Sequence, residues 1–465
     1  MTRPACIPDE FWNALPVELR PGLLAVVAAF EARIADLESR LGQNSSNSSR
    51  PPSSDPPGLK RAVPRPAGRR RRGGQEGHPK ARRTILTPDE VVDHKPTRCS
   101  DCGTPLAGDD PEPRVDQVIE LPAKLRHVIH HRRHTLECPR CRARTAAASA
   151  PEAARGFGPR LQAGAAYLAG VGRLGKRAIR RFFADLCGIP IATGSVSKLE
   201  ARTSDALHSI HAEALGHAQG LDANVDETGW KQGPDKAWLW VAATRAMTVF
   251  LVRRNRDRAA FDDLVGPSPG VLTTDRFSVY KHLPAERRQV CWAHLRRDFQ
   301  AMIDRRDRGS PIGEGLLMHA DILADEWRKV REGARTRRWF RRAILPWLRE
   351  EVRGLLEAGA RCVGIKTARV CGELLGLEPS LWTFADREGI EPTNNAAERA
   401  VRHAVCWRKM SYGTAGERGS RFVERMLTAV SSCRSQGRDV LEFLLDAIQA
   451  HRSGSTPPSL VPAKA

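Results

Sequence analysis

The chain has 465 residues, more than one hydrophobic core usually organises, and its apolar fraction of 41% is enough to bury several cores. Lysine and arginine number 75 against 54 acidic residues, and the net charge of +21 favours nucleic acid as a partner. No apolar run approaches the roughly 20 residues of a membrane span, and the N-terminus, with Asp9 and Glu10, lacks a secretory signal, so a cytoplasmic protein is expected.

An apolar stripe marks the first predicted helix, over residues 21–41. Its members are separated by steps of four and three residues, which places them on one helical face. They are Leu23, Val27, Phe30, Ile34, Leu37 and Leu41. The stripe needs a partner, which is either the body of its own chain or a second copy in a short coiled coil. The coiled coil would make the protein a homo-oligomer.

Residues 43–58 (QNSSNSSRPPSSDPPG) cannot bury apolar surface, so they predict a flexible linker. Residues 60–83 then carry ten basic side chains against the single acid Glu76. Four consecutive guanidiniums repel one another unless anions lie between them, and they belong to Arg69, Arg70, Arg71 and Arg72. We expect a disordered arm that lies along DNA phosphates, although a solvated charged tail has the same composition.

The eleven cysteines are an odd set, and in a reducing compartment they are better candidates for metal ligands than for disulfides. Four of them form two CxxC pairs: Cys99, Cys102, Cys138 and Cys141. Two such turns can supply the four thiolates of a tetrahedral structural zinc. The long interval between the pairs predicts an inserted segment with strands near residues 115–121 and 124–135. The alternative is two unrelated pairs of reduced cysteines.

Residues 161–202 have the apolar spacing of helices, with one break. The helix after the break, which Thr193 or Ser195 can cap, resembles the second helix of a helix-turn-helix. It would offer Lys198 and Arg202 to a groove of DNA. Ordinary helical packing explains the same pattern.

From Gly220 onward the pattern is that of strands. Runs rich in Val, Trp and Phe predict three strands, then a helix, a fourth strand, and a fifth strand before another helix. The ranges are 221–228, 237–244, 247–252, 257–264 for the helix, 270–275 and 289–293. Antiparallel strands extended by parallel ones through helical crossovers make a mixed α/β sheet, and the ribonuclease H-like fold has this order.

Acidic residues fall where these strands end. Asp226 lies near the end of the first strand and Asp275 at the end of the fourth, and in this topology the two strands are neighbours. Paired carboxylates repel unless a divalent cation neutralises them, and magnesium prefers such oxygen ligands. A third acid is expected on a later helix packed against these strands. Glu398, on a helix that Thr393 or Asn394 would cap, is the strongest candidate.

Landmarks along nearly the whole chain resemble those of the DDE transposases of the insertion-sequence 66 family (TnpC type). They are the coiled-coil helix, QNSSNSSRPPSSD, GGQEGHPK, the paired CxxC, VDETGW, TTDRFSVY, CWAHLRRDF and NNAAERAVRHAVCWRK. Each motif alone is weak, but together and in this order they are highly specific. The run KMSYGTAGERGS departs from the commonest members.

The resemblance implies that Asp226, Asp275 and Glu398 are catalytic acids that bind magnesium or manganese. It implies metal-dependent cleavage at transposon ends and strand transfer into target DNA. It also places Cys291 and His294 beside the later strands, where His294 either meets the scissile phosphate or braces the fold. The implied partners are transposon-end and target DNA, further copies of the chain on that DNA, and small accessory proteins encoded by the same element.

The long interval between Asp275 and Glu398 exceeds what a plain ribonuclease H-like sheet needs and predicts a helical insertion. The chain is then expected to comprise an N-terminal helix (1–42), a disordered linker and basic arm (43–83), a zinc-binding domain (84–150), a helical DNA-binding segment (151–215), the first part of the catalytic core (216–302), an α-helical insertion (303–390), the second part of the core (391–450) and a disordered tail (451–465).

Two other functions fit part of this pattern. A decayed transposase could bind DNA through its arm, zinc module and helices without catalysis, and a ribonuclease H-like nuclease could cut without joining. The complete set of acids disfavours the non-catalytic protein, and a strand-transfer assay separates the nuclease from the transposase.

Overall fold

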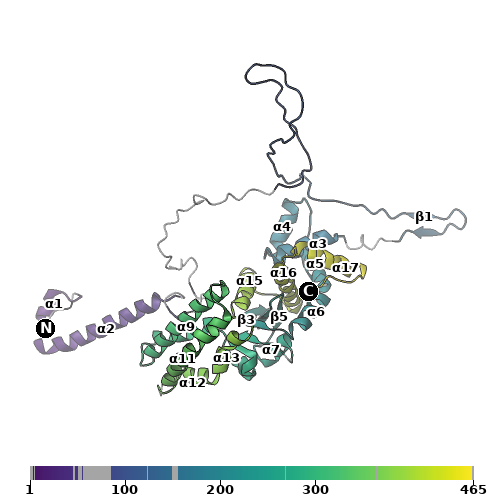
Figure 1. Ribbon diagram of the computed structural model, residues 1–465. Coiled ribbons are helices and arrows are strands. Elements are labelled where there is room, and N and C mark those ends of the chain that lie inside the picture. Colours follow the sequence, from purple (N-terminus) through teal and green to yellow (C-terminus); the bar gives the residue numbers. More distant parts are fainter. Residues whose placement is uncertain are drawn as a thin grey trace. The chain divides into compact units, whose positions relative to one another are not determined.

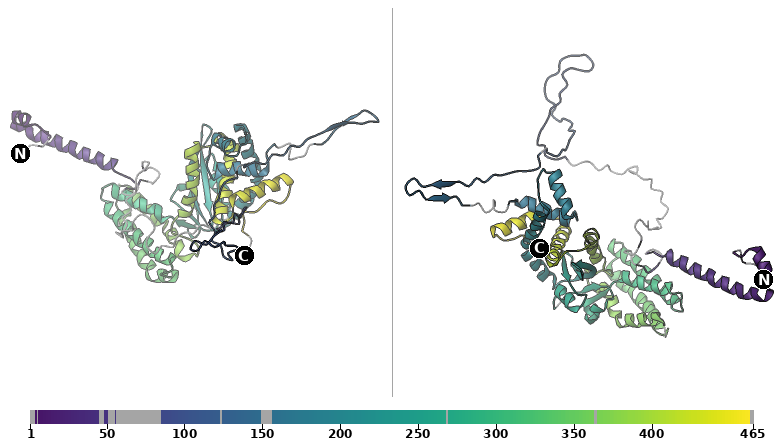
Figure 2. Two further views of the ribbon diagram at one scale, coloured as in Figure 1. Left: turned by 90° about the horizontal axis from the view of Figure 1, so that it is seen from above. Right: turned by 180° about the vertical axis from the view of Figure 1, so that it is seen from behind.

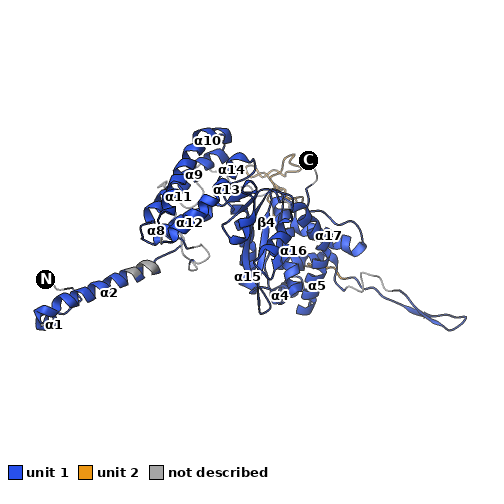
Figure 3. Cartoon of the chain, turned by 90° about the horizontal axis from the view of Figure 1, so that it is seen from below, with its two compact units in different colours: residues 1–60, 129–465 blue, residues 61–128 orange. Residues whose placement is uncertain are grey.

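The computed structural model (Figure 1) describes residues 4, 6–44, 48–50, 55, 85–122, 124–148, 156–267, 269–362 and 365–462. The chain forms two units, one of residues 1–60 with 129–465 and the other of residues 61–128 (Figure 3). Most of the predicted linker and nearly all of the basic arm, including Arg69, Arg70, Arg71 and Arg72, lie outside the described residues. Among the helices that the structure describes, none is both long and apolar enough to cross a membrane.

The predicted N-terminal helix is present. It is α2 (Arg20–Leu41), and α1 (Asp9–Ala14) and the 3-10 helix η1 (Val17–Leu19) precede it. Its apolar stripe faces solvent, since Phe30 and Leu41 are both more than half exposed. A second helix could cover such a face, so dimerisation through α2 stays a prediction.

A short antiparallel hairpin follows, in which β1 (Thr135–Glu137) pairs with β2 (Arg144–Ala146) around the second CxxC pair. The prediction of strands near residues 115–121 and 124–135 was wrong. Of the residues described in these two ranges, only Thr135 belongs to a strand. Their apolar residues have strand propensity, but Val118 is 90% exposed. Propensity alone does not form a strand where no partner strand packs against it.

Helices precede the sheet, as the spacing over residues 161–202 predicted. They are α3 (Pro159–Gly170), α4 (Lys176–Asp185), α5 (Thr193–Ala206) and α6 (His208–Ala218). The predicted cap of α5 was wrong, because Thr193 is already the first helical residue and Ala192 holds the N-cap position without a side-chain cap. The backbone is extended at Ala192, so the helix begins one residue earlier than a Thr193 cap requires.

A mixed five-stranded sheet has the order β5-β4-β3-β6-β7. Its elements in chain order are β3 (Ala223–Gln232), β4 (Asp235–Ala243), β5 (Thr248–Arg253), the helix α7 (Arg258–Val265), β6 (Leu272–Thr274) and β7 (Arg288–Val290). Antiparallel pairing joins β3 to β4 and β4 to β5, whereas β6 is parallel to both β3 and β7. Every predicted strand of this region is present, and the mixed sheet is confirmed.

The long interval after the sheet is helical, as predicted. Its helices are α8 (Trp292–Asp304), α9 (Ser310–Arg331), α10 (Arg337–Ala343), α11 (Leu345–Ala360), α12 (Lys366–Gly376), α13 (Glu378–Leu381) and α14 (Thr383–Asp386). They share a core around Leu316, Leu348 and Phe384. Figures 1 and 2 show them in green as a helical lobe on one side of the sheet.

Three helices close the fold: α15 (Asn395–Ser411), α16 (Glu417–Ser435) and α17 (Val440–Ser453). The disordered tail predicted over 451–465 was wrong for its described part, up to residue 462. Leu460 is only 1% exposed, and its carbonyl accepts a hydrogen bond from Gln436 Nε2 (2.7 Å). Leu460, together with Val461 beside it, thus anchors a segment that is otherwise rich in Ser and Pro.

The sheet buries side chains on both faces, which alternate along each strand. Trp230, Leu239 and Val241 lie on one face, in a core that they share with α3 to α6 and α15 to α17. Val225 and Trp240 pack on the opposite face against α7. Asp226 and Trp230 are an even number of residues apart on β3, so their side chains point to the same face. The side chain of Asp226 therefore lies on the face that α15 covers.

Helix α16 covers the outer edge of β5. Ser432, Thr428 and Glu424 accept hydrogen bonds from the backbone N–H groups of residues 248, 250 and 252, at 3.1, 3.0 and 2.9 Å. Four helical residues rise about 6 Å, close to the roughly 6.6 Å of two strand residues. The spacing of the acceptors on α16 therefore matches the spacing of the N–H donors on β5. The exposed row of donors that makes an edge strand prone to aggregation is thereby satisfied.

Replacing Thr428 with valine is expected to lower the free energy of unfolding by about 1–3 kcal/mol. Valine has the same shape, but it leaves the buried N–H of Phe250 without an acceptor. Urea denaturation of the two proteins measures the difference. Ser435→Ala, on an exposed turn of the same helix, should change stability much less, and equal losses in both variants would contradict this role of Thr428.

Candidate active site

Neighbouring parallel strands bring the two predicted aspartates level with one another, at the edge of the sheet where β6 and β7 end. The prediction that Asp226 lies near the end of its strand was wrong, because β3 continues to Gln232. Thr273 of β6 pairs with Asn224 of β3, and Asp275 and Asp226 each lie two residues further along. On the other side of β6, Cys291 directly follows β7. The strand topology therefore places three side chains with potential ligand atoms level with one another.

Glu398 reaches this edge on the first turn of α15, and Asn394 fixes that turn. Asn394 is fully buried, and its Nδ2 donates to the carbonyl oxygen of Val225 on β3 (2.8 Å). In return, Asn224 Nδ2 donates to the carbonyl oxygen of Thr393 (3.0 Å). The start of α15 is thus bound to β3 from both sides. Asn394 does hold the predicted N-cap position, but its side chain makes no capping bond because it serves the strand instead.

The carboxylates influence one another electrostatically. Burial, and then the charge of Glu227, raise the pKa of Asp226 to about 8, and Asp275 and Glu398 add to the rise. The backbone N–H of Glu227 donates to Asp226 Oδ1 (2.9 Å) and opposes it. Asp226, Asp275 and Glu398 are therefore near enough for their charges to interact. Among the described residues, however, their oxygens do not all lie within 4.8 Å of one another.

Glu227 is the acid next to Asp226, but it lies on the opposite face of the sheet. Its side chain is 2% exposed, accepts a hydrogen bond from Arg256 Nε (2.9 Å) and is bonded by the hydroxyl of Tyr280. Arg256 is held by stacking over the ring of Phe277 (3.7 Å). Its partners therefore satisfy Glu227 as a structural ion pair, and Asp226 alone of the two faces α15.

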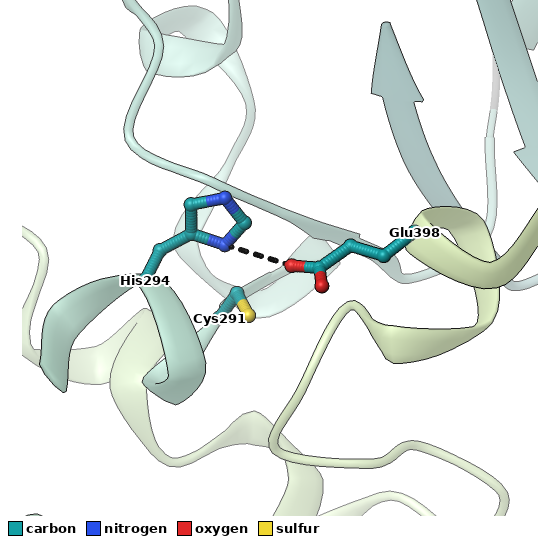
Figure 4. A group of neighbouring side chains, drawn as sticks. All are labelled: Cys291, His294 and Glu398. Carbon is teal, nitrogen blue, oxygen red and sulfur yellow. Dashed lines mark ion pairs between the residues drawn. The ribbon is translucent and has the colours of Figure 1, made fainter. Parts of the chain in front are cut away.

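Cys291, His294 and Glu398 form a group whose ligand atoms lie within 4.8 Å of one another. Figure 4 shows His294 pointing toward Glu398, with Nδ1 3.5 Å from Oε1. Both of these atoms are buried without a hydrogen-bond partner. Burial, and then Arg297, lower the pKa of His294, so the neutral imidazole is favoured at pH 7. Such a ring can accept a proton or bind a cation.

Sequence reasoning missed two residues of this site. Arg297 lies one turn after His294 on α8, and its guanidinium is 3.8 Å from Glu398 Oε1. The spacing of His and Arg in CWAHLRR carried the signal, since residues three apart share a helical face. The structural role of Asn394 had no local signal, because its partner lies on a distant strand.

Comparison with known proteins identifies the family of the chain. Residues 156–421, more than half of the chain, match the Transposase IS66 family. The chain belongs to this family. Residues 6–84 also match a Family of unknown function (DUF6444). The Uncharacterized protein y4qI of Sinorhizobium fredii (strain NBRC 101917 / NGR234) is 25% identical over 235 residues, which are 45% of this chain and 42% of that protein.

Membership confirms the family that the motifs indicated. The part matched by the IS66 family includes Asp226, Asp275 and Glu398, and also His294. The four cysteines of the CxxC pairs lie outside both matched ranges.

The two CxxC pairs of this IS66-family transposase form turns with the same hydrogen bonds. The N–H of the first cysteine donates to the carbonyl five residues on, at 2.9 Å for both Cys99 and Cys138. The N–H of the residue four positions on donates back, from Gly103 at 3.1 Å and from Arg142 at 2.8 Å. Both of these residues adopt a left-handed backbone conformation, with φ of 74° and 64°. A left-handed arginine is uncommon, so the second turn is held in the same shape at some cost.

Hydrogen bonds also favour thiolates in these turns. The side-chain hydrogen bond with Thr104 is the main reason that the pKa of Cys102 falls to about 7. The backbone N–H groups of Cys141 and Arg140 lower the pKa of Cys138. The pairs belong to different units, so a shared zinc site stays a prediction.

The predicted DNA contacts on α5 are on the surface. Lys198 and Arg202 are both exposed, one helical turn apart. Their contact with DNA stays a prediction.

Proposed function

We propose that the chain cleaves DNA at transposon ends and transfers the freed strand into target DNA, with Asp226, Asp275 and Glu398 as the catalytic acids. The observation that carries this proposal is their convergence from β3, β6 and α15, with the charges of Asp275 and Glu398 raising the pKa of Asp226. The strand order β5-β4-β3-β6-β7 supports a ribonuclease H-like core.

The residues fit magnesium or manganese. The cluster offers hard carboxylate oxygens, and Glu398 Oε1 is buried without a hydrogen-bond partner. Bound divalent cations would lower the pKa of an attacking water, orient an in-line displacement and stabilise the leaving 3′ oxygen. We assign Asp226, Asp275 and Glu398 as the ligands.

The residues around Glu398 would hold this third acid in position. Asn394 holds the start of α15 against β3, which sets the distance from Glu398 to Asp226. His294 and Arg297, both on α8, lie beside Oε1 of Glu398. We propose that His294 acts by positioning Glu398, since that carboxylate oxygen is what its Nδ1 faces.

A strand-transfer assay tests the proposal. The substrate is a duplex that carries an end of the element, incubated with magnesium and a target plasmid. A transposase yields joined product, a nuclease yields nicks without joining, and a non-catalytic DNA-binding protein yields neither. Binding without cleavage would overturn the proposed activity, and nicking alone would limit it to hydrolysis.

We also propose that Cys99, Cys102, Cys138 and Cys141 bind one structural zinc, as four thiolates do in a closed tetrahedral site. The matched geometry of the two turns and the lowered pKa of Cys102 and Cys138 support this.

Purified protein is therefore expected to contain about one zinc per chain, and Cys99→Ser or Cys138→Ser should lose it and unfold at lower temperature. Metal analysis and thermal unfolding measure both effects. Cys6→Ser, at an exposed cysteine outside the pairs, is the control. Wild-type protein without zinc, or full zinc retention in both variants, would contradict the proposal.

A further inference from the structure

A basic groove lies between α5 and α16, away from the carboxylates. It encloses about 570 Å³ and is lined by Lys198, Ala201, Arg202, Ser204, Asp205, Arg418, Arg421 and Arg425. Five of these side chains are basic and one is acidic. Clustered like charges destabilise a fold unless anions neutralise them, so the groove has the composition of an anion-binding surface.

The basic residues follow one face of each helix. Lys198 and Arg202 are one turn apart on α5, and Arg418, Arg421 and Arg425 occupy positions i, i+3 and i+7 on α16. Seven helical residues span roughly 10 Å, and one DNA strand presents a phosphate about every 3.4 Å along the duplex axis. The groove is therefore long enough for two or three successive phosphates.

Two of the arginines are held in place by the protein itself. Arg421 donates to the carbonyl oxygen of Val252 (2.7 Å) and pairs with Glu424 (2.9 Å). Arg425 donates to the carbonyl and hydroxyl oxygens of Ser204, both at 3.0 Å. Their Nε atoms are buried and have no hydrogen-bond partner. Guanidiniums fixed in this way lose little further side-chain entropy when an anion binds.

We infer that this groove binds the phosphate backbone of DNA. The inference rests on the proposed function, because it takes DNA as the substrate, and it adds α16 to the contact surface that the sequence indicated on α5. Backbone contacts position a duplex without reading its sequence. The groove would therefore hold transposon DNA in a fixed position on the protein, whatever its sequence.

The test is DNA binding by Lys198→Ala/Arg418→Ala, since both side chains are exposed and anchor nothing described in the fold. The probe is a short duplex of arbitrary sequence, titrated with the full chain over a range of salt concentrations. Each lost phosphate contact should reduce the slope of log affinity against log salt by about 1, so the double variant should lose about 2 and bind roughly tenfold more weakly.

Arg338→Ala/Arg369→Ala, at exposed positions on α10 and α12, removes the same charge and is the matched control. Unchanged binding by the groove variant, or an equal loss in the control, would overturn the inference. Thermal unfolding confirms that both variants are folded. Wild-type protein that binds the duplex through the groove but cuts no transposon end would overturn the proposed catalysis and leave the groove standing.

Discussion

Substitution of Asp226 by asparagine is expected to lower DNA cleavage by roughly 10³-fold or more while DNA binding stays within a few fold. The loss of one carboxylate ligand removes several kcal/mol of metal-dependent stabilisation, and each 1.36 kcal/mol is a factor of ten in rate. Asp275→Asn and Glu398→Gln should have the same effect. Single-turnover cleavage of an end-containing duplex and filter binding in parallel measure the two quantities.

Glu227→Gln is the matched control, because Glu227 is adjacent in sequence and also carries a carboxyl group but lies on the opposite face of β3. A glutamine keeps an oxygen that can accept from Tyr280, although it weakens the pair with Arg256. We expect it to reduce stability and to leave cleavage within about tenfold of wild type. Cleavage that survives in Asp226→Asn and disappears in Glu227→Gln would show that the wrong acid was chosen.

The sheet and the two aspartates were predictable because their signals are local. Asp275 directly follows β6 and Asp226 lies within β3, and the order of strands and helices makes the two strands neighbours. Period-2 alternation also separates Asp226 from Glu227, since successive side chains point to opposite faces. These inferences need only the chain's own periodicity and topology.

Other features depend on partners far away in the sequence, which periodicity does not reveal. Asn394 looked like a helix cap, but its partner is the carbonyl of Val225. Thr428 and Glu424 read as ordinary polar positions of an amphipathic helix, whereas they satisfy the edge of β5. Leu460 and Val461 are an isolated apolar pair in the tail, too short to show a helical or strand periodicity. In each case a tertiary contact overrides the local pattern.

Substitution of Asn394 by alanine is expected to lower cleavage by about 10- to 100-fold and to raise the magnesium concentration needed for half-maximal cleavage. Asn394 positions Glu398 by binding the start of α15 to β3, and residues that orient metal ligands have effects of this size. The substitution also removes the side-chain amide that donates a hydrogen bond to the carbonyl oxygen of Val225. Magnesium titrations of the cleavage rate measure the shift.

The neighbouring Asn395→Ala separates positioning from simple damage to the helix. Asn395 is the same residue type one position on, but it is exposed and is the first residue of α15. A general weakening of the helix start would affect both variants alike, whereas loss of the bond to β3 affects only Asn394→Ala. If saturating magnesium fails to recover any activity in Asn394→Ala, or if Asn395→Ala shows the same shift, then Asn394 does not act through the geometry of Glu398. A shift confined to Asn394→Ala would tie the third acid to the sheet through one buried amide, and this explains why a residue some 170 positions from Asp226 can complete the same site.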